Sequence, residues 1–530
     1  MRSYCSFEYL GIILPLVVIV YNLVKKKYRW LVLLLCSYCF FYLISKELVI
    51  YLVLATFGIH HFGIWLTLVQ NRQNEELKTV AKSERKSLKL CYRNKQRKIL
   101  ALAVTLNLGI LVVLKYSGFL IKNLNSLLAI FKLDFSLSVP AFIIPIGISF
   151  YTLRAISYLF DVYYEKIKAD QSLGRLALYM SFFPLTMEGP ICRYSEVTES
   201  LYQGNPVTYQ NLTFGIQRIF YGLFKKMVIA DRLNAFISNV FQDYSSYDGG
   251  IIFVGALLYT CQLYMEFSGT MDVVIGSGQI FGVRMPENFK QPFFSKSISE
   301  FWQRWHISLG LWFKDYLFYP LSMSKPIKNL SSKLRKRFGN HHGAVLAGGI
   351  ALLAVWLGNG LWHGVGWNYI FFGLYHFALI LTANFIEPTI KKIQNKLHIN
   401  PASFGYKLIR IIKTSILVVI GELFFRAEGL KVGIRMFIKI FSDFSLQSFT
   451  NGKIYELGMD KYDFFILAIA VIIVLIISIL KEKNIKIRQT VAKQNIVIRW
   501  GLYYALIIFI IVFGAYGTGY IPVDPIYANF

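Results

Sequence analysis

His363 is the residue of this chain with the clearest potential for chemistry, because it ends the apolar run VWLGNGLWH at residues 355–363. A titratable ring at membrane depth loses hydration that hydrocarbon cannot replace, so such residues usually face a protein interior or a water-filled path. A neutral imidazole can accept the proton of a hydroxyl that attacks a carbonyl, which is general-base chemistry. The alternative is a histidine that packs among aromatic rings and hydrogen-bonds a carbonyl.

A second histidine, His306, lies in the segment 299–319, which the spacing of its apolar residues predicts to be one helix. Ser299 is the expected N-cap, and Glu300 adds a negative charge to the first turn. Aromatic and leucine side chains recur at helical spacing at Trp302, Trp305, Leu309, Trp312, Phe313 and Tyr316. Packing explains that face well, but Arg304, His306 and Asp315 put three polar groups on a helix otherwise built for burial.

The elements that position these residues must be membrane helices. The chain has 530 residues, of which 55% are hydrophobic and 16% charged, and its mean hydropathy is +0.48. A soluble globular protein needs a more polar surface. Apolar runs of about 17 to 25 residues, enough to cross a bilayer, recur along the chain. We therefore predict an all-α polytopic membrane protein, whose six scattered cysteines form no disulfide framework.

The net charge of +28 is distributed in short basic clusters between apolar runs. This pattern is typical of cytoplasmic loops under the positive-inside rule, and it argues against a nucleic-acid partner. Membrane lipids are the expected partner of these charges. Threading the apolar segments back and forth places both termini outside and the following clusters in the cytoplasm: 25–29, 72–98, 325–337, 391–413 and 481–499.

No internal repeat or linker divides the chain, so we predict a single integral membrane domain over residues 1–530. Its parts are N-terminal helices at 1–139, a core at 140–385 and C-terminal transmembrane helices at 386–530. A basic cytoplasmic segment at 71–98 is either an amphipathic helix or disordered. Helix breakers and charges interrupt the apolar sequence between 140 and 232, and residues 286–292 suggest a bent or re-entrant connection. Such features are tolerated at membrane depth where they are buried in protein or line a cavity.

Several blocks of this sequence, taken in order, resemble the membrane-bound O-acyltransferase (MBOAT) family, most closely its bacterial branch that modifies alginate and lipoteichoic acid. The blocks are PIGISFY at 145–151, GPICRY at 189–194, GLFKKMVIAD at 222–231, PENF at 286–289, SISEFWQRWHISL at 297–309, WFKDYL at 312–317 and GLWHG at 360–364. The resemblance covers about residues 140–385.

This resemblance implies a ring of tilted transmembrane helices around a thinned, funnel-containing centre. It implies transfer of a small acyl group, acetyl or D-alanyl, from a cytosolic thioester to hydroxyls of an extracellular exopolysaccharide or teichoic acid, in a bacterial cytoplasmic membrane. His363 matches the family's catalytic histidine and His306 the second functional one, which positions the acceptor or stabilises the oxyanion. The residues expected to bind substrate are Trp305, Arg304, Asp315, Asn359, Trp362, Arg193 and Asp272.

The expected donor is acyl-CoA or the phosphopantetheine of an acyl carrier protein, with no permanently bound cofactor and no metal. An extracellular esterase-like partner is expected to help complete transfer to the polymer. The sequence departs from the family pattern at Glu188, Glu266, Thr270, Met271, Gly310 and Phe377, which bears on the identity of the acceptor. Two other functions fit the composition: a transporter of a small acyl or anionic substrate, and a non-catalytic scaffold.

Overall fold

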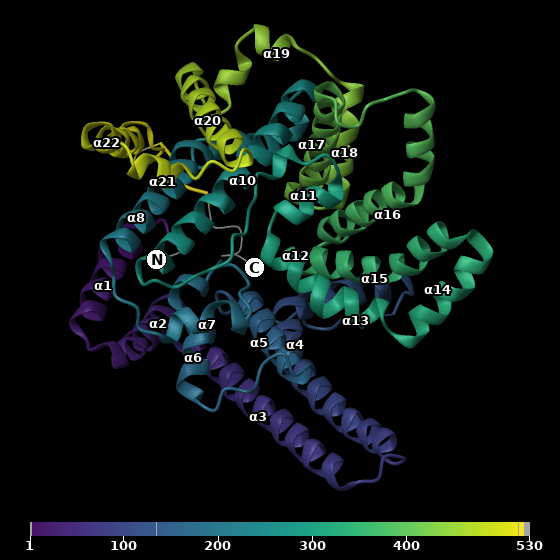
Figure 1. The fold of residues 1–530 in the computed structure, drawn as a ribbon. Helices are drawn as coiled ribbons and strands as arrows, with labels where there is room; N and C mark the ends of the chain where they lie inside the picture. Colours follow the sequence, from purple (N-terminus) through teal and green to yellow (C-terminus); the bar gives the residue numbers. More distant parts are fainter. Residues whose placement is uncertain (1–2, 134, 518, 524–530) are drawn as a thin grey trace. The chain divides into compact units, whose positions relative to one another are not determined.

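The computed structural model describes residues 3–133, 135–517 and 519–523, and throughout these the regular structure is helical. Seven helical segments there are long and apolar enough to cross a membrane. These segments are Lys26–Thr79, Arg85–Ile130, Gly249–Ile280, Asn340–His363, Trp367–Lys396, Lys461–Glu482 and Ile496–Phe513. The prediction of an all-helical, multi-pass membrane protein is therefore confirmed. By its internal contacts the chain forms two compact units. Figure 1 labels their helices.

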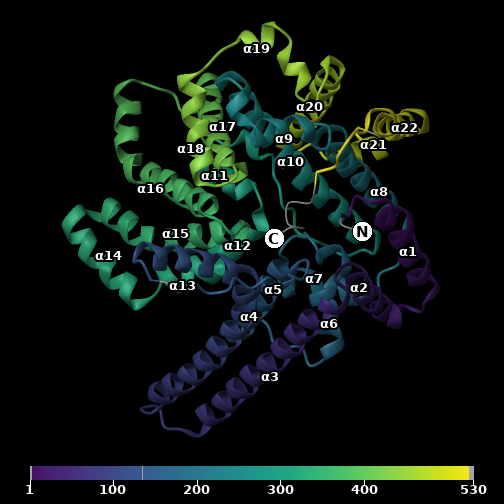
Figure 2. The same cartoon turned by 180° about the vertical axis from the view of Figure 1, so that it is seen from behind.

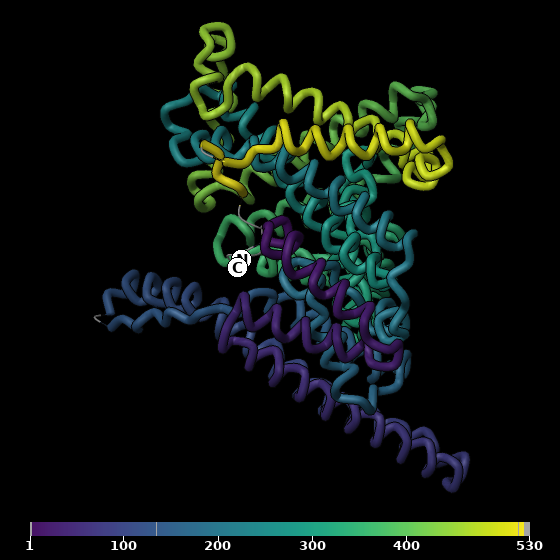
Figure 3. Tube along the Cα trace, turned by 90° about the vertical axis from the view of Figure 1, so that its left-hand side faces the viewer, coloured from purple at the N-terminus to yellow at the C-terminus, as the bar shows by residue number. Residues whose placement is uncertain are grey.

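Of the described residues, the first unit comprises 3–133, 135–215 and Val274–Pro286. Its helices are α1 (Leu14–Leu23), α2 (Arg29–Ser45), α3 (Val49–Thr79), α4 (Arg85–Ile130), α5 (Ile148–Tyr163), α6 (Leu173–Ser181) and α7 (Tyr194–Tyr202). Helices α3 and α4 lie side by side, as both face-on views show (Figures 1 and 2). Figure 3 shows α3 from the side as one long helix in purple. The basic segment 71–98 is thus two helix ends joined by a turn at 80–84, not a disordered loop.

A buried charge inside the first unit, that of Arg154, is satisfied by carbonyls of the unit's own backbone. Arg154 in α5 is 1% exposed, and its guanidinium donates to the carbonyls of Tyr179 at 3.1 Å and Met180 at 2.9 Å. Gly147, which precedes α5, has a φ of +77°, and a Cβ there would lie 1.9 Å from the carbonyl oxygen of Thr186. Only glycine fits that backbone position. These contacts explain how a charge and a helix break are accommodated between 140 and 232.

The second unit comprises Ile216–Val273 and Glu287–Ile526. Its helices are α9 (Asn234–Gln242), α11 (Ile298–Arg304), α12 (Ile307–Phe313), α13 (Tyr319–Ser322), α14 (Lys325–Phe338), α15 (Asn340–His363), α16 (Trp367–Lys396), α17 (Phe404–Arg426), α18 (Leu430–Ser442), α19 (Gln447–Thr450), α20 (Lys461–Glu482), α21 (Ile487–Ala492) and α22 (Ile496–Phe513). Helices α8 (Tyr209–Leu223) and α10 (Gly249–Ile280) have residues in both units. The neighbours α15 and α16 pack along each other (Figure 1).

The single helix predicted over 299–319 is wrong, because the structure divides it at Trp305 and His306. Helix α11 is capped by Ser297, whose hydroxyl accepts the backbone N–H of Glu300 at 3.1 Å, rather than by Ser299. After Trp305 the backbone of His306 turns left-handed, with φ 46° and ψ 50°, and α12 starts in a new direction. A π-helical segment, Lys314–Phe318, follows. The spacing of apolar residues predicted a continuous helix because it contains no sign of the hydrogen bonds, made with another segment, that break the helix at His306.

Candidate active site

His363 is the last residue of α15 and is buried, with 6% of its surface exposed. Its ring packs in edge-on contacts against Trp362 at 5.1 Å, Phe425 at 5.3 Å and Phe372 at 6.1 Å between ring centroids. Helical spacing puts Trp356, Asn359 and Gly360 on the face of α15 that also carries His363. An aromatic cage therefore holds this imidazole away from bulk water.

His306 occupies the N-cap position of α12 and is 2% exposed. Its ring lies edge-on to Phe267 of α10, with centroids 4.8 Å apart, and 5.5 Å from the ring of Trp362. Burial lowers the pKa of His306 well below its usual range, and the neighbouring His363 lowers it further. His306 is therefore neutral at physiological pH.

The structure brings these two histidines together, although 57 positions separate them in the sequence. Their ring centroids lie 6.4 Å apart, with the ring planes at 66°. The ring of Trp362 contacts both imidazoles, with centroids 5.5 Å from His306 and 5.1 Å from His363. Two imidazoles at this separation can contact one small group at the same time, for example a hydroxyl and the carbonyl that it attacks.

Two other residues predicted to bind substrate, Asn359 and Trp305, lie near the pair. Asn359 is 8% exposed, one turn before His363. Among the described residues its side-chain oxygen Oδ1 has no hydrogen-bond partner. Trp305 precedes His306 and packs against Phe301 at 5.4 Å and Phe289 at 5.2 Å. Trp305 therefore supports the backbone that carries His306.

Arg304 and Asp315 flank His306 in the sequence but have different surroundings. Arg304 makes ion pairs of 2.9 Å with Glu300 on its own helix and with Glu482 at the end of α20. It therefore ties α11 to α20. Asp315 is half-buried in the π-helical segment beyond α12.

Asp272 is held by two cations in the second unit. Its carboxylate lies 2.8 Å from Nε of Arg218 and 2.7 Å from Nζ of Lys225, and it is 7% exposed. The same guanidinium bridges to Glu287, directly before the segment that contacts His306. Arg193 belongs to the first unit, where its backbone N–H donates to Glu196 at 2.8 Å.

Asn288, His376 and Glu422 are buried polar residues of the second unit that were not predicted as site residues from the sequence. Asn288 hydrogen-bonds His306 and Ser308. His376 is fully buried in α16 and accepts the indole N–H of Trp302 at 3.3 Å. Asn288 follows Glu287 and is close to Lys290 and Gln291 in a polar stretch, so the local sequence gave no signal that it is buried. His376 and Glu422 did give a signal, because they are polar residues inside apolar helices.

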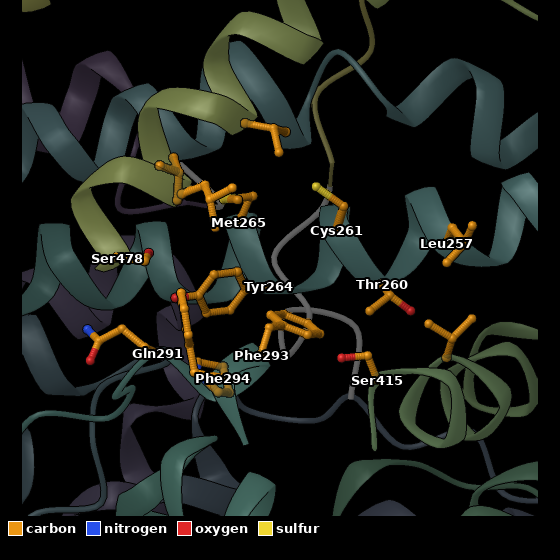
Figure 4. Close-up of a pocket in the computed structure, with 15 residues that line it drawn as sticks. Leu257, Thr260, Cys261, Tyr264, Met265, Gln291, Phe293, Phe294, Ser415 and Ser478 are labelled. Carbon is orange, nitrogen blue, oxygen red and sulfur yellow. The ribbon is translucent and has the colours of Figure 1, made fainter. Parts of the chain in front are cut away.

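The second unit also contains an apolar cavity of about 280 Å³ that does not include the histidines (Figure 4). Its walls come from α10, α17, α20 and the turn Pro292–Phe294, with Tyr264 and Phe293 among the lining side chains. Both rings contact Trp305, at 5.8 and 6.4 Å, so an aromatic layer separates this cavity from His306. Among the described residues no group of three or more histidine, cysteine or acidic side chains is placed to hold a metal ion.

Fold and site together define a multi-pass helical membrane protein with a buried pair of imidazoles. The sequence profile of the membrane-bound O-acyltransferase family matches residues 48–335, a range that includes His306 and ends before His363. The chain is 32% identical to the probable alginate O-acetylase AlgI of Pseudomonas putida over 439 residues, which cover 83% of this chain and 80% of that protein.

Two further relatives carry different names. The peptidoglycan O-acetyltransferase of Helicobacter pylori is 33% identical over 303 residues, covering 52% of this chain and 53% of that protein. The teichoic acid D-alanyltransferase of Bacillus subtilis is 32% identical over 251 residues, covering 47% and 60%. The chain thus belongs to the membrane-bound O-acyltransferase family. It is an O-acyltransferase, which favours the enzyme over the transporter and the scaffold.

Proposed function

We propose that this enzyme transfers a small acyl group, acetyl or D-alanyl, from a cytosolic thioester to hydroxyl groups of an extracellular cell-envelope polymer. The observation that carries the proposal is the buried pair formed by His306 and His363, whose rings lie 6.4 Å apart. The printed names of the relatives add support, because they concern alginate, peptidoglycan and teichoic acid. The protein would act in the cytoplasmic membrane of a bacterium.

In the proposed reaction His363 is the general base. It takes the proton of the acceptor hydroxyl as the hydroxyl oxygen bonds to the thioester carbonyl carbon. The resulting tetrahedral intermediate collapses, the carbon–sulfur bond breaks, and the imidazolium returns the proton to the leaving thiolate. His306 either positions the acceptor hydroxyl or stabilises the oxyanion. The aromatic cage excludes water, which would otherwise hydrolyse the thioester.

The donor is proposed to be acyl-CoA or the phosphopantetheine of an acyl carrier protein, and an extracellular esterase-like protein is proposed to assist delivery to the polymer. Asn359, Trp305 and Trp362 are the proposed substrate-binding residues nearest the pair. For Arg304, Asp272, Asp315 and Arg193 a substrate-binding role is also proposed. The ion pairs of Arg304 and Asp272 suggest that these two act by holding the surrounding helices in place.

The test is acyl transfer in inside-out membrane vesicles that are supplied with radiolabelled acetyl-coenzyme A or, separately, with a D-alanyl-loaded carrier protein. We expect His363→Ala to lower ester formation by about 10² to 10⁴-fold, the usual contribution of a general base. The matched control is His398→Asn, because His398 is exposed and its φ of +51° is one that asparagine tolerates. Unchanged ester formation in His363→Ala would overturn the proposal, and label that crosses without ester formation would point to transport.

A further inference from the structure

Asn288 lies in the non-helical connection between α10 and the turn Pro292–Phe294, and it is 1% exposed. Its backbone carbonyl accepts the N–H of Ile307 at 3.0 Å. Its side-chain oxygen Oδ1 accepts both the N–H of Ser308, at 3.0 Å, and the hydroxyl of Ser308, at 2.9 Å. The first N–H groups of a helix have no partner within that helix. Asn288 therefore caps α12 from a distant part of the chain.

These bonds explain why His306 adopts a left-handed backbone. With φ 46° it occupies a backbone region that residues other than glycine rarely adopt. The two N–H groups that follow it are both fixed by Asn288, so this residue determines the direction in which α12 leaves. The same amide lies beside the imidazole, with Oδ1 of Asn288 3.3 Å from Nδ1 of His306.

The identity of the contacting amide atom follows from its neighbours. A backbone N–H can only donate, so the side-chain atom that meets Ser308 N must be the oxygen. The amide nitrogen Nδ2 then faces the sulfur of Met271 at 3.3 Å, a weak acceptor. Because an amide oxygen cannot donate, its contact with His306 is favourable only when Nδ1 carries the proton. A neutral imidazole has one N–H, so the lone pair is on Nε2.

We infer that Asn288 is a positioning residue that holds His306 in the Nδ1–H tautomer, so that Nε2 accepts a hydrogen bond from the acceptor hydroxyl. This inference rests on the proposed acyl transfer and decides between the two roles left open for His306. An Nε2 that carries a lone pair cannot donate to an oxyanion, but it can orient the O–H group that His363 deprotonates. His306 thus orients the nucleophilic hydroxyl, and groups other than His306 stabilise the negative charge on the carbonyl oxygen.

The direct test is nitrogen NMR of the full-length protein with ¹⁵N-labelled histidine, reconstituted in lipid nanodiscs at pH 8. The signals of His306 are assigned by their loss in His306→Asn. We expect a protonated Nδ1 and an unprotonated Nε2 in the wild-type protein. We expect Asn288→Asp to keep this tautomer, because its carboxylate still accepts from both neighbours, and Asn288→Leu to lose it. The matched control is Asn239→Leu, since Asn239 is exposed and its side-chain amide donates to the carbonyl of Leu457 at 3.1 Å, far along the chain from His306.

Activity provides the second measurement. We expect Asn288→Leu to lower kcat/KM by about 10 to 100-fold, as is typical when a residue that orients a functional histidine is removed, and Asn288→Asp to recover much of that loss. Asn288→Leu should add little in a His306→Asn background, since both changes remove one function. A wild-type spectrum with the proton on Nε2 would overturn the inference, even if Asn288→Leu fails to fold. The spectrum is independent of turnover, so retained activity in His363→Ala would count against the proposed function alone.

Discussion

Gly360 of α15 packs directly on the carbonyl of Tyr369 in α16, so that a Cβ at Gly360 would lie 2.3 Å from that oxygen. The contact is reciprocal, because a Cβ at Gly373 of α16 would lie 2.3 Å from the carbonyl oxygen of Trp356. Small residues let membrane helices approach at this distance. Gly360 is three residues before His363, so this helix crossing fixes the position and direction of the His363 imidazole.

We expect Gly360→Ala to lower both stability and acyl transfer, because the added methyl must push α15 away from α16. Overpacking of this kind costs about 1–3 kcal/mol. The control is Gly348→Ala in the same helix, where a Cβ meets nothing within 4 Å. Apparent Tm and ester formation should fall in the first variant only. Equal behaviour of the two variants would show that the crossing is not tight.

Stability should depend on the protonation of His306 at acidic pH. Its pKa is lowered in the folded protein by burial and by His363, whereas an unfolded histidine titrates near about 6.5. Below that pH His306 is protonated in the unfolded state but stays neutral in the folded state. The free energy of unfolding therefore falls as pH falls, by up to about 1.4 kcal/mol per pH unit. Apparent Tm measured from pH 8 to pH 5 should decline less steeply in His306→Asn. Parallel curves for the two proteins would contradict this prediction.

The buried ion pairs of Asp272 predict a large stability effect. Asp272→Asn would leave Lys225 and Arg218, whose side chains are 5% and 11% exposed, without that counter-charge. Breaking one partner of a buried pair costs about 3–5 kcal/mol. As a control, Glu387→Gln removes an exposed pair with Lys391, and such pairs contribute less than about 1 kcal/mol. Thermal unfolding should distinguish the two, and a Tm for Asp272→Asn as high as that of the control would exclude a stabilising role.

The role of Arg304 can be separated from substrate binding by comparison with its partner. If Arg304 anchors α11 to Glu482 of α20, then Arg304→Gln and Glu482→Gln should lower kcat/KM to a similar extent. The double variant should then be little worse than either single one. If Arg304 binds substrate directly, only Arg304→Gln raises KM. Steady-state kinetics of the three variants decide between these outcomes.

The sequence predicted much of the fold because burial in a bilayer leaves a local signal. Apolar runs of spanning length predict membrane helices, and the structure contains seven candidates. Sequence-based prediction reaches its limit at 299–319, where apolar spacing predicted one helix and the structure has a break at His306. The break depends on Asn288, which lies 18 positions earlier, so no local pattern contained it. The sequence also left undecided whether the segment 71–98 is helical or disordered. Its helices are stabilised by the packing of α3 on α4, which no local pattern shows.

For the site, the sequence by itself determined that His363 and His306 are candidate functional residues. Burying an imidazole in an apolar setting costs free energy, so such residues are kept mainly where they have a function. Only the tertiary structure decided that their rings lie 6.4 Å apart, that Asn288 bonds His306, and that Arg304 and Asp272 are engaged in ion pairs. The physical reason is the distance along the chain over which each property is determined. The cost of burying a polar group depends on its neighbours in the sequence, whereas its bonding partner comes from a distant segment that only folding brings close.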